Sequence, residues 1–291
     1  MYLNTAKFLP HAPCPRPHAK NEQARRDNML LRTIPLRGIL PFGEGSGDKR
    51  VLVGHVAPFL LWIGVIFLVQ ALNSGGLTAP WLHPWSYALK SIACAVLFFW
   101  LKPWRVYSAL QRRNVMPALL AGILVALIWI FPESMWLRAK WPGVYEFYCR
   151  WLITMPGSLP SYFPDLPPGH SSWSYAPQSA GWILTIAKLV GSCCVIAVIE
   201  EFFFRGFLYR RLICEHFWKQ PLREFDLQPF LITVAVFGLE HDRWLAGMIA
   251  GAVYGALIVW RGDIWAAALA HGVTNFLLGL YVIAMQQYAF W

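Results

Sequence analysis

The sequence predicts an all-α protein whose helices form a polytopic bundle across a membrane. Of its 291 residues, 57% are hydrophobic and only 14% are charged, whereas soluble domains carry about 25% charged residues. Apolar stretches suited to a hydrocarbon core of about 30 Å recur along the chain. We count seven, and an eighth is compatible with the pattern: Val51–Leu72, Pro84–Leu101, Val115–Phe131, Ser179–Phe204, Gln228–Leu239, Trp244–Trp260 and Ile264–Tyr288.

The loops between these stretches alternate in charge, which supports the same fold class. Lys and Arg are frequent before Val51 and in loops 102–114 and 205–227, whereas 73–83 has no charged residue and 132–178 is balanced. Cytoplasmic loops carry the excess of Lys and Arg. The pattern therefore places the N-terminus in the cytoplasm and the C-terminus outside. It also accounts for the net charge of +10 without nucleic-acid binding.

The predicted spans divide the chain into three parts. Residues 1–50 are polar, basic and rich in Pro, so we expect a disordered cytoplasmic tail. Residues 51–178 hold the first three spans and an external loop, 132–178, rich in Pro and Trp; its segment WPGVYEFYCRWLITMP could lie flat in the interface. We favour an outer loop over a lid there. Residues 179–291 are the expected catalytic core.

Polar motifs are concentrated in that last part, and in each the paired residues are four apart, which places them on one helix face. They are EExxxR (Glu200, Glu201, Arg205), FxxxH (Phe237, His241) and HxxxN (His271, Asn275). We take Arg210, Gln228 and Gly262 as the points where the three helices meet the inner membrane surface. With a rise of 1.5 Å per residue, Glu200, His241 and His271 then lie roughly 15, 20 and 13 Å below that surface. Polar groups at one depth on three helices must face one another or a cavity, because none can face lipid cheaply.

Other residues of this part have structural interpretations. Glu201 and Arg205 can form an intrahelical ion pair, since an unpaired charge in the membrane is costly. Phe237 is expected to pack beside His241. Small residues four apart allow close helix contact, as at Gly247, Gly251 and Gly255. We expect a break between two helices at Glu240, Asp242 and Arg243, and Lys188 extending toward the outer surface.

The ordered set EExxxR, FxxxH and HxxxN resembles the CPBP superfamily, which holds the CAAX proteases and bacteriocin-processing intramembrane endopeptidases. The resemblance covers about residues 180–285, including GMIAGAVYGALIVWRGDIWAAALAHGVTN. The start near Arg50 and the chain length are similar to CAAX prenyl protease-related proteins found with bacterial exosortase systems. The resemblance implies an endopeptidase of the bacterial inner membrane that acts on a lipid-anchored or hydrophobic-tailed protein.

It also implies roles for the motif residues. Glu200 would be the general base for a water that His241 holds and polarises. His271 and Asn275 would donate hydrogen bonds to the oxyanion of the tetrahedral intermediate, which can contribute about 3 to 4 kcal/mol per donor. No metal or other cofactor is favoured. Members of the superfamily have been described as metalloproteases, however, so zinc bound by Glu200, His241 and His271 stays an alternative.

Two non-proteolytic alternatives stay open. Buried Glu, Arg and His also make proton relays in transporters, although the N-terminal spans carry no matching charges. The protein could also be a catalytically silent scaffold, because buried His and Asn often only bridge helices, contributing about 0.6 to 2 kcal/mol each.

Overall fold

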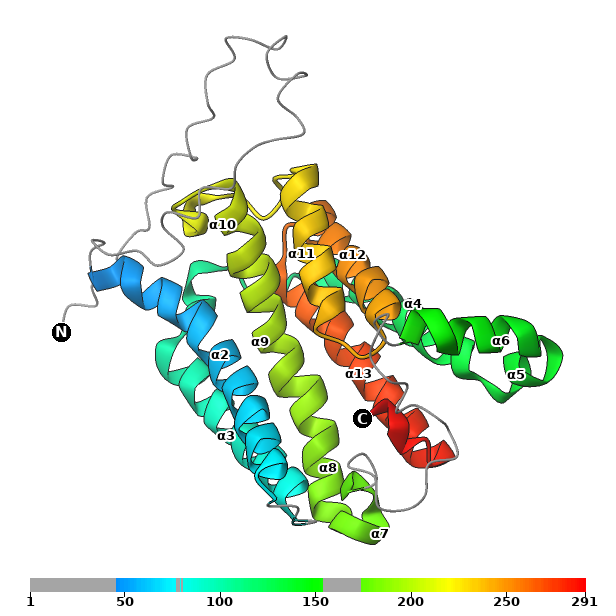
Figure 1. Cartoon of the computed structure of the whole chain (residues 1–291). Coiled ribbons are helices and arrows are strands. Elements are labelled where there is room, and N and C mark those ends of the chain that lie inside the picture. The colour runs from blue at the N-terminus through cyan, green and yellow to red at the C-terminus, as the bar shows by residue number, and fades with distance from the viewer. Residues whose placement is uncertain (1–45, 77–78, 80, 154–173) are drawn as a thin grey trace.

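The computed structural model describes residues 46–76, 79, 81–153 and 174–291, which form a bundle of helices without a strand (Figure 1). A continuous central helix runs over Trp182–Ile213; it consists of α8 (Trp182–Val190), α9 (Ala197–Glu201) and α10 (Tyr209–Ile213), joined by π-helical segments at Gly191–Ile196 and Phe202–Leu208. The other long helices are α2 (Ser46–Ser74), α3 (Leu82–Leu101), α4 (Arg112–Ile130), α11 (Leu227–Leu239), α12 (Trp244–Arg261) and α13 (Ile264–Met285).

The predicted fold class is confirmed, but the count of seven or eight spans is not. Within the described residues six helices are long and apolar enough to cross a membrane. The exception is α11, whose 13 residues rise only about 20 Å, less than a hydrocarbon core of about 30 Å. The turn that follows α11 lies inside the bundle instead, where irregular backbone is tolerated because it lines a cavity.

The structure differs from the sequence-based expectation in two segments that flank the predicted spans. Residues 46–50, expected in the tail, form the first turn of α2, while the rest of the predicted tail lies outside the described residues. The expected loop 132–178 contains two short helices, α5 (Met135–Lys140) and α6 (Pro142–Tyr148), which project sideways from the bundle (Figure 1). A third short helix, α7 (Pro177–Ala180), precedes the central helix; residues 154–173 are outside the described part.

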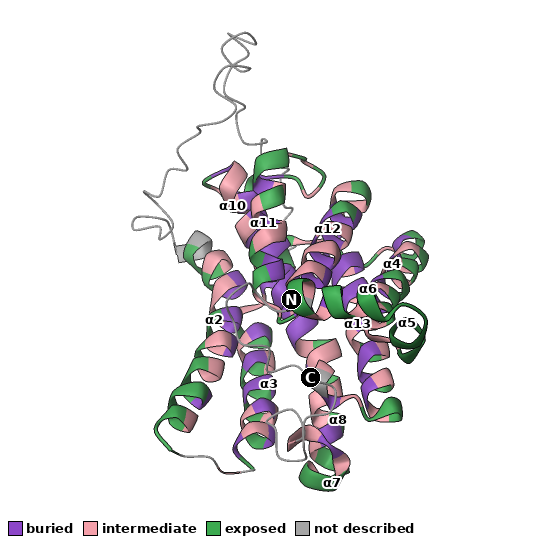
Figure 2. Cartoon of the chain, turned by 45° about the vertical axis from the view of Figure 1, so that its right-hand side comes forward, coloured by how far each residue is buried: buried purple, intermediate pink, exposed green. Residues whose placement is uncertain are grey.

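The helices are arranged around the central one, with α2 and α3 on one side and α4, α11, α12 and α13 on the other (Figure 1). Exposed apolar residues cover outward faces, as the green patches on α2 and α3 in Figure 2 show; Phe67 and Trp100 are examples, 64% and 69% exposed. In a soluble protein such surface would be an aggregation liability. Here it is the surface expected to contact lipid.

Capping groups align the helices that carry the site. Asp263 caps α13 by accepting bonds from the backbone N–H groups of Trp265 and Ala266. Its second oxygen accepts from the Asn114 amide and the Gln111 backbone N–H, which places the starts of α4 and α13 side by side. A side-chain cap contributes about 1 kcal/mol, and this one also fixes the relative height of two helices.

Glycines set the closest helix contacts. The predicted small-residue ridge is confirmed: a Cβ at Gly247, Gly251 or Gly255 would meet atoms of α11 or its following turn at 3.1, 3.2 and 2.8 Å. A still closer contact joins α4 to α13, where a Cβ on Gly122 would lie 2.5 Å from the carbonyl oxygen of Ala270. The Gly122 carbonyl also accepts a bond from Thr274.

Replacing Gly122 by alanine should therefore push α4 away from α13. Overpacking of this kind costs about 1 to 3 kcal/mol, so G122A should lower the thermal unfolding temperature in detergent. Gly64 is the matched control, because a Cβ there meets nothing within 4 Å and alanine is the better helix former. Equal unfolding temperatures for G122A and G64A would contradict the close contact.

Candidate active site

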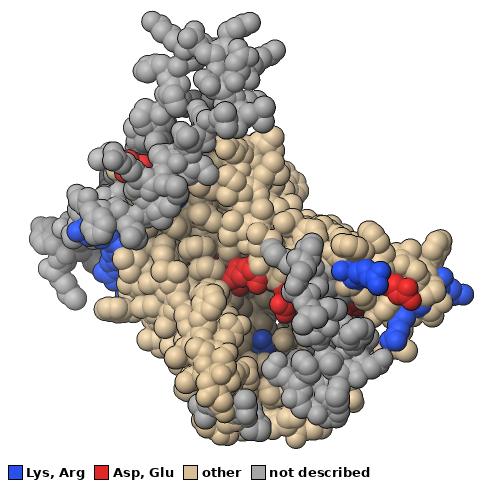
Figure 3. All heavy atoms as spheres, viewed as in Figure 1, with Lys and Arg blue, Asp and Glu red and all other residues tan. Residues whose placement is uncertain are grey.

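A cavity of about 1090 Å³ lies at the centre of the bundle, at the upper end of the range for ligand pockets. It is lined by Glu200, His241, His271 and Asn275, so the structure brings together the polar residues of three separate helical segments. Glu201 and Arg205 do not line it. In Figure 3 acidic side chains gather at a hollow in one face of the molecule, and a basic side chain is visible inside it.

Behind the cavity wall, Glu201 joins the first motif to the third. Its Oε1 accepts a hydrogen bond from Arg205 Nη1 at 3.0 Å, as the predicted ion pair requires, and another from His271 Nδ1 at 3.1 Å. Glu201 and Arg205 are 0% and 2% exposed. Charge-assisted bonds of this kind are about twice as strong as neutral ones, so Glu201 fixes both the arginine and the orientation of the imidazole.

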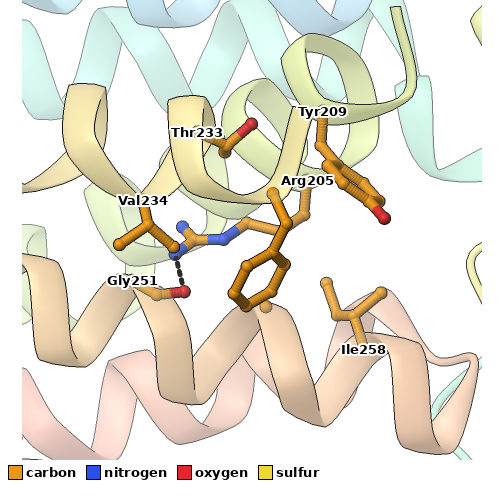
Figure 4. A pocket seen from close by; sticks show the side chains of 8 residues that line it. Arg205, Tyr209, Thr233, Val234, Gly251 and Ile258 are labelled. Carbon is orange, nitrogen blue, oxygen red and sulfur yellow. Dashed lines mark hydrogen bonds between the residues drawn. The ribbon is translucent and has the colours of Figure 1, made fainter. Parts of the chain in front are cut away.

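Arg205 reaches away from the large cavity, into the contact between α11 and α12 (Figure 4). Its Nη2 donates to the carbonyl oxygen of Gly251 at 2.9 Å, and its guanidinium lies 4.3 Å from the ring centroid of Phe237. A separate cavity beside it measures about 10 Å³, the smallest size that holds one water. Arg205 therefore reaches the main cavity indirectly, through Glu201 and through Phe237, which lines that cavity.

Glu200 has the opposite environment. It lines the main cavity, and its Oε2 is buried without a hydrogen-bond partner among the described residues. His271 Nε2 lies 3.7 Å from this oxygen, which is beyond hydrogen-bond distance. A carboxylate that lines a cavity and has unused lone pairs can accept a proton from water. The two π-helical segments flank this glutamate pair, and π-bulges occur frequently at functional sites.

The two histidines are oriented by different partners. The backbone carbonyl of Phe237 accepts from His241 Nδ1 at 2.7 Å; this assigns the proton to Nδ1 and leaves Nε2 to interact elsewhere. The His241 ring lies against Trp129 and Phe237. The His271 ring stacks on Tyr254 at a centroid distance of 5.0 Å. With Nδ1 bound to Glu201, the Nε2 of His271 faces Glu200.

Asn275 and Phe237 complete the predicted set. One N–H of the Asn275 amide donates to the carbonyl oxygen of Ser192 at 2.9 Å, and an amide nitrogen has a second N–H to offer the cavity. Phe237 is fully buried and its ring contacts both His241 and His271, which confirms its packing role. One aromatic side chain thus separates the two histidines.

Sequence reasoning missed Glu240 as a cavity residue. It lies in the turn between α11 and α12, where the expected helix break is confirmed, yet it lines the cavity, and its Oε2 is buried without a hydrogen-bond partner in the described part of the chain. The criterion that identified Glu200, an acid at membrane depth, applies equally to Glu240. Arg243 of the same turn forms an ion pair with Glu133 at the end of α4, which fixes the turn.

The zinc alternative requires Glu200, His241 and His271 to lie close enough together to bind one ion. Zinc binds tetrahedrally at about 2.0 to 2.2 Å from nitrogen and oxygen ligands, so its ligands must lie close together. Across residues 46–76, 79, 81–153 and 174–291, no three His, Cys, Asp or Glu side chains form such a group. As arranged here, Glu200, His241 and His271 do not fit a zinc ion.

The Glu201–Arg205 contact leads to a stability prediction. Arg205→Met would leave Glu201 buried with no ion-pair partner other than His271, and breaking a buried pair costs about 3 to 5 kcal/mol. We expect a much lower thermal unfolding temperature in detergent. Arg112→Met is the matched control, since Arg112 is exposed and should change little. An Arg205→Met protein as stable as the control would show that the pair contributes nothing.

Comparison with known proteins agrees with the motifs. The family model for type II CAAX prenyl endopeptidase Rce1-like proteins matches residues 182–277, from the start of α8 into α13. The match contains all three motifs and confirms the family that they indicated. No curated protein and no solved structure matches the chain.

Proposed function

Residues 182–277 match the type II CAAX prenyl endopeptidase family, and on this basis we propose that this integral membrane protein is a glutamate-dependent intramembrane endopeptidase. The family implies a CAAX-type protease; Glu200 as its general base is our proposal. The observation that carries it is that Glu200 lines the central cavity together with His241 and His271, and that its Oε2 has no hydrogen-bond partner in the described part of the chain.

The proposed reaction needs no covalent intermediate. Glu200 takes a proton from a water that also binds His241 Nε2, and the water oxygen attacks the carbonyl carbon of the peptide bond. The carbonyl oxygen becomes an oxyanion, stabilised by N–H groups of His271 and Asn275. Glu200 then returns the proton to the leaving nitrogen, so the C–N bond breaks to give a carboxylic acid, which keeps the second proton of the water, and an amine. General base catalysis contributes about 10²- to 10⁴-fold.

The contact between Glu201 and His271 supports the oxyanion role. An imidazole can donate from Nε2 while its Nδ1–H bonds a carboxylate only in the imidazolium form; the proposal assigns that form to His271, whose Nδ1 lies 3.1 Å from Glu201 Oε1. Arg205 in turn neutralises Glu201. We assign Glu201 and Arg205 as positioning residues, which act through His271 and do not touch the substrate.

The substrate we propose is a membrane-associated protein with a lipid anchor or a hydrophobic tail. The cavity opens between helices whose outer faces are apolar, so a substrate in the membrane can reach it without leaving the bilayer. Following the charge pattern of the loops, we propose that the N-terminus lies in the cytoplasm. The resemblance to CAAX prenyl protease-related proteins leads us to propose a bacterial inner membrane and an association with exosortase systems.

Glu200→Gln should abolish proteolysis and leave the protein folded. The amide keeps the shape but cannot take a proton, so we expect a loss of at least about 100-fold. The measurement is cleavage of a farnesylated CAAX peptide in proteoliposomes, with C-terminal mass spectrometry of membrane proteins from cells that carry either form. Glu215→Gln, a change at an exposed glutamate, is the control.

Retained trimming in the Glu200→Gln protein would refute Glu200 as the base. Proton-coupled flux that disappears in this variant, without any cleavage by the native protein, would instead favour the transporter. If neither cleavage nor flux is found, the silent scaffold is favoured.

Chelation separates the glutamate mechanism from the zinc alternative. Because Glu200, His241 and His271 do not form a metal group here, we expect purified protein treated with a strong chelator to keep its cleavage rate. Stoichiometric zinc by elemental analysis, with activity lost on its removal and restored on its return, would overturn the metal-free mechanism.

A further inference from the structure

Two lysines outside the motifs line the same central cavity as Glu200. Lys90, on α3, is only 8% exposed, and its Nζ lies 4.1 Å from the ring centroid of Trp62 and 5.0 Å from that of Tyr87. Lys188, on α8, does not extend to the outer surface as expected. Its Nζ lies 4.0 Å from the Tyr87 centroid and 4.9 Å from that of Tyr175.

The two amino groups lie around the same ring, that of Tyr87. Because both lie within 5.0 Å of the Tyr87 ring centroid, they are no more than about 9 Å apart. Neither has an ion pair or hydrogen bond to a carboxylate among the residues that the structure describes. Aromatic faces contribute about 0.5 to 2 kcal/mol per cation, whereas charges inside a membrane protein are normally paired. The site is therefore suited to an anion supplied from outside the described chain.

The charged side chains that line the cavity differ between its two ends. Glu200, Glu240 and Asp242 line its catalytic end together with Arg243, which is paired with Glu133, and Lys90 and Lys188 line it at α3 and the start of the central helix. An anionic group of a bound substrate would be repelled at the first end and attracted at the second. This arrangement fixes the direction in which a peptide with one charged end can bind.

The distance between Lys188 and Glu200 limits how far along the substrate peptide the anionic group can lie from the cleaved bond. Lys188 and Glu200 are twelve positions apart on the continuous central helix, a rise of about 18 Å. An extended peptide covers that distance in about five residues, at roughly 3.3 to 3.6 Å each, and fewer suffice because both side chains reach into the cavity. The end of a peptide cleaved near its C-terminus meets this requirement.

We propose that Lys90 and Lys188 bind the C-terminal α-carboxylate of the substrate peptide, about five residues or fewer beyond the bond that is cleaved. The inference rests on the proposed function and names how its substrate is recognised. The two lysines are specificity residues for a free C-terminus. A peptide whose C-terminus is amidated loses the anion, and one extended by ten residues carries its carboxylate past the lysines.

Binding to the Glu200→Gln protein in nanodiscs tests this without requiring cleavage. The probes are one farnesylated CAAX peptide with a free C-terminal carboxylate, its C-terminal amide, and a version extended by ten polar residues. We expect the free acid to bind at least about tenfold more tightly than either other peptide, since hydrogen bonds to a charged group are stronger than those to a neutral one. Lys90→Met and Lys188→Met should remove this preference.

The controls separate loss of charge from loss of folding. Lys188→Arg keeps the charge and should keep the preference for the acid, and Lys140→Met, at an exposed lysine, should have no effect. Equal binding of acid and amide, absence of binding by both, or a preference that survives both methionine changes would overturn the inference. So would a lysine-dependent affinity for phosphatidylglycerol nanodiscs that the peptide does not compete with.

The failure of the two proposals can be told apart. If the acid is preferred in binding but native protein cleaves no peptide, the endopeptidase is refuted and the carboxylate site is not. If the native protein cleaves acid and amide at equal rates, the carboxylate site is refuted and the endopeptidase is not.

Discussion

The need to pair buried charge determines how this protein is built. Arg205 and Glu201 are almost completely buried within a membrane helix, where an unpaired charge would be costly, and they bind each other. Each residue of the pair also forms a hydrogen bond to another helix. Glu201 also binds His271 on α13, and Arg205 binds the backbone of α12 at Gly251. One ion pair thus connects three helices and orients an imidazole toward the cavity.

The same contacts explain why packing and chemistry cannot be separated here. Arg205 can reach the Gly251 carbonyl because the glycines of α12 let α11 approach closely, and Phe237 of α11 covers the guanidinium while it separates His241 from His271. On the opposite side of α13, Gly122 brings α4 into contact. Small residues therefore set the distances between the polar ones, and interior packing transmits any change among them.

The cavity also has a distribution of charge that the motifs do not express. Three carboxylates, Glu200, Glu201 and Glu240, are gathered where the central helix, α13 and the turn after α11 meet, with one arginine among them. Two lysines lie over aromatic rings on α3 and α8. In a medium of low dielectric such a separation of charge acts strongly, and it supports our proposal that the peptide binds in one direction with its C-terminus at the lysines.

The sequence by itself determined the all-α membrane fold, six of the seven predicted spans and the Glu201–Arg205 pair, because hydropathy and the i to i+4 relation are properties of a helix alone. Only the tertiary structure decided that α11 ends inside the bundle, that Glu201 also holds His271, and that Glu240, Lys90 and Lys188 share the cavity of Glu200. These residues lie on different segments, up to 181 positions apart. Their distances depend on how glycines and aromatic side chains pack, which no local spacing encodes.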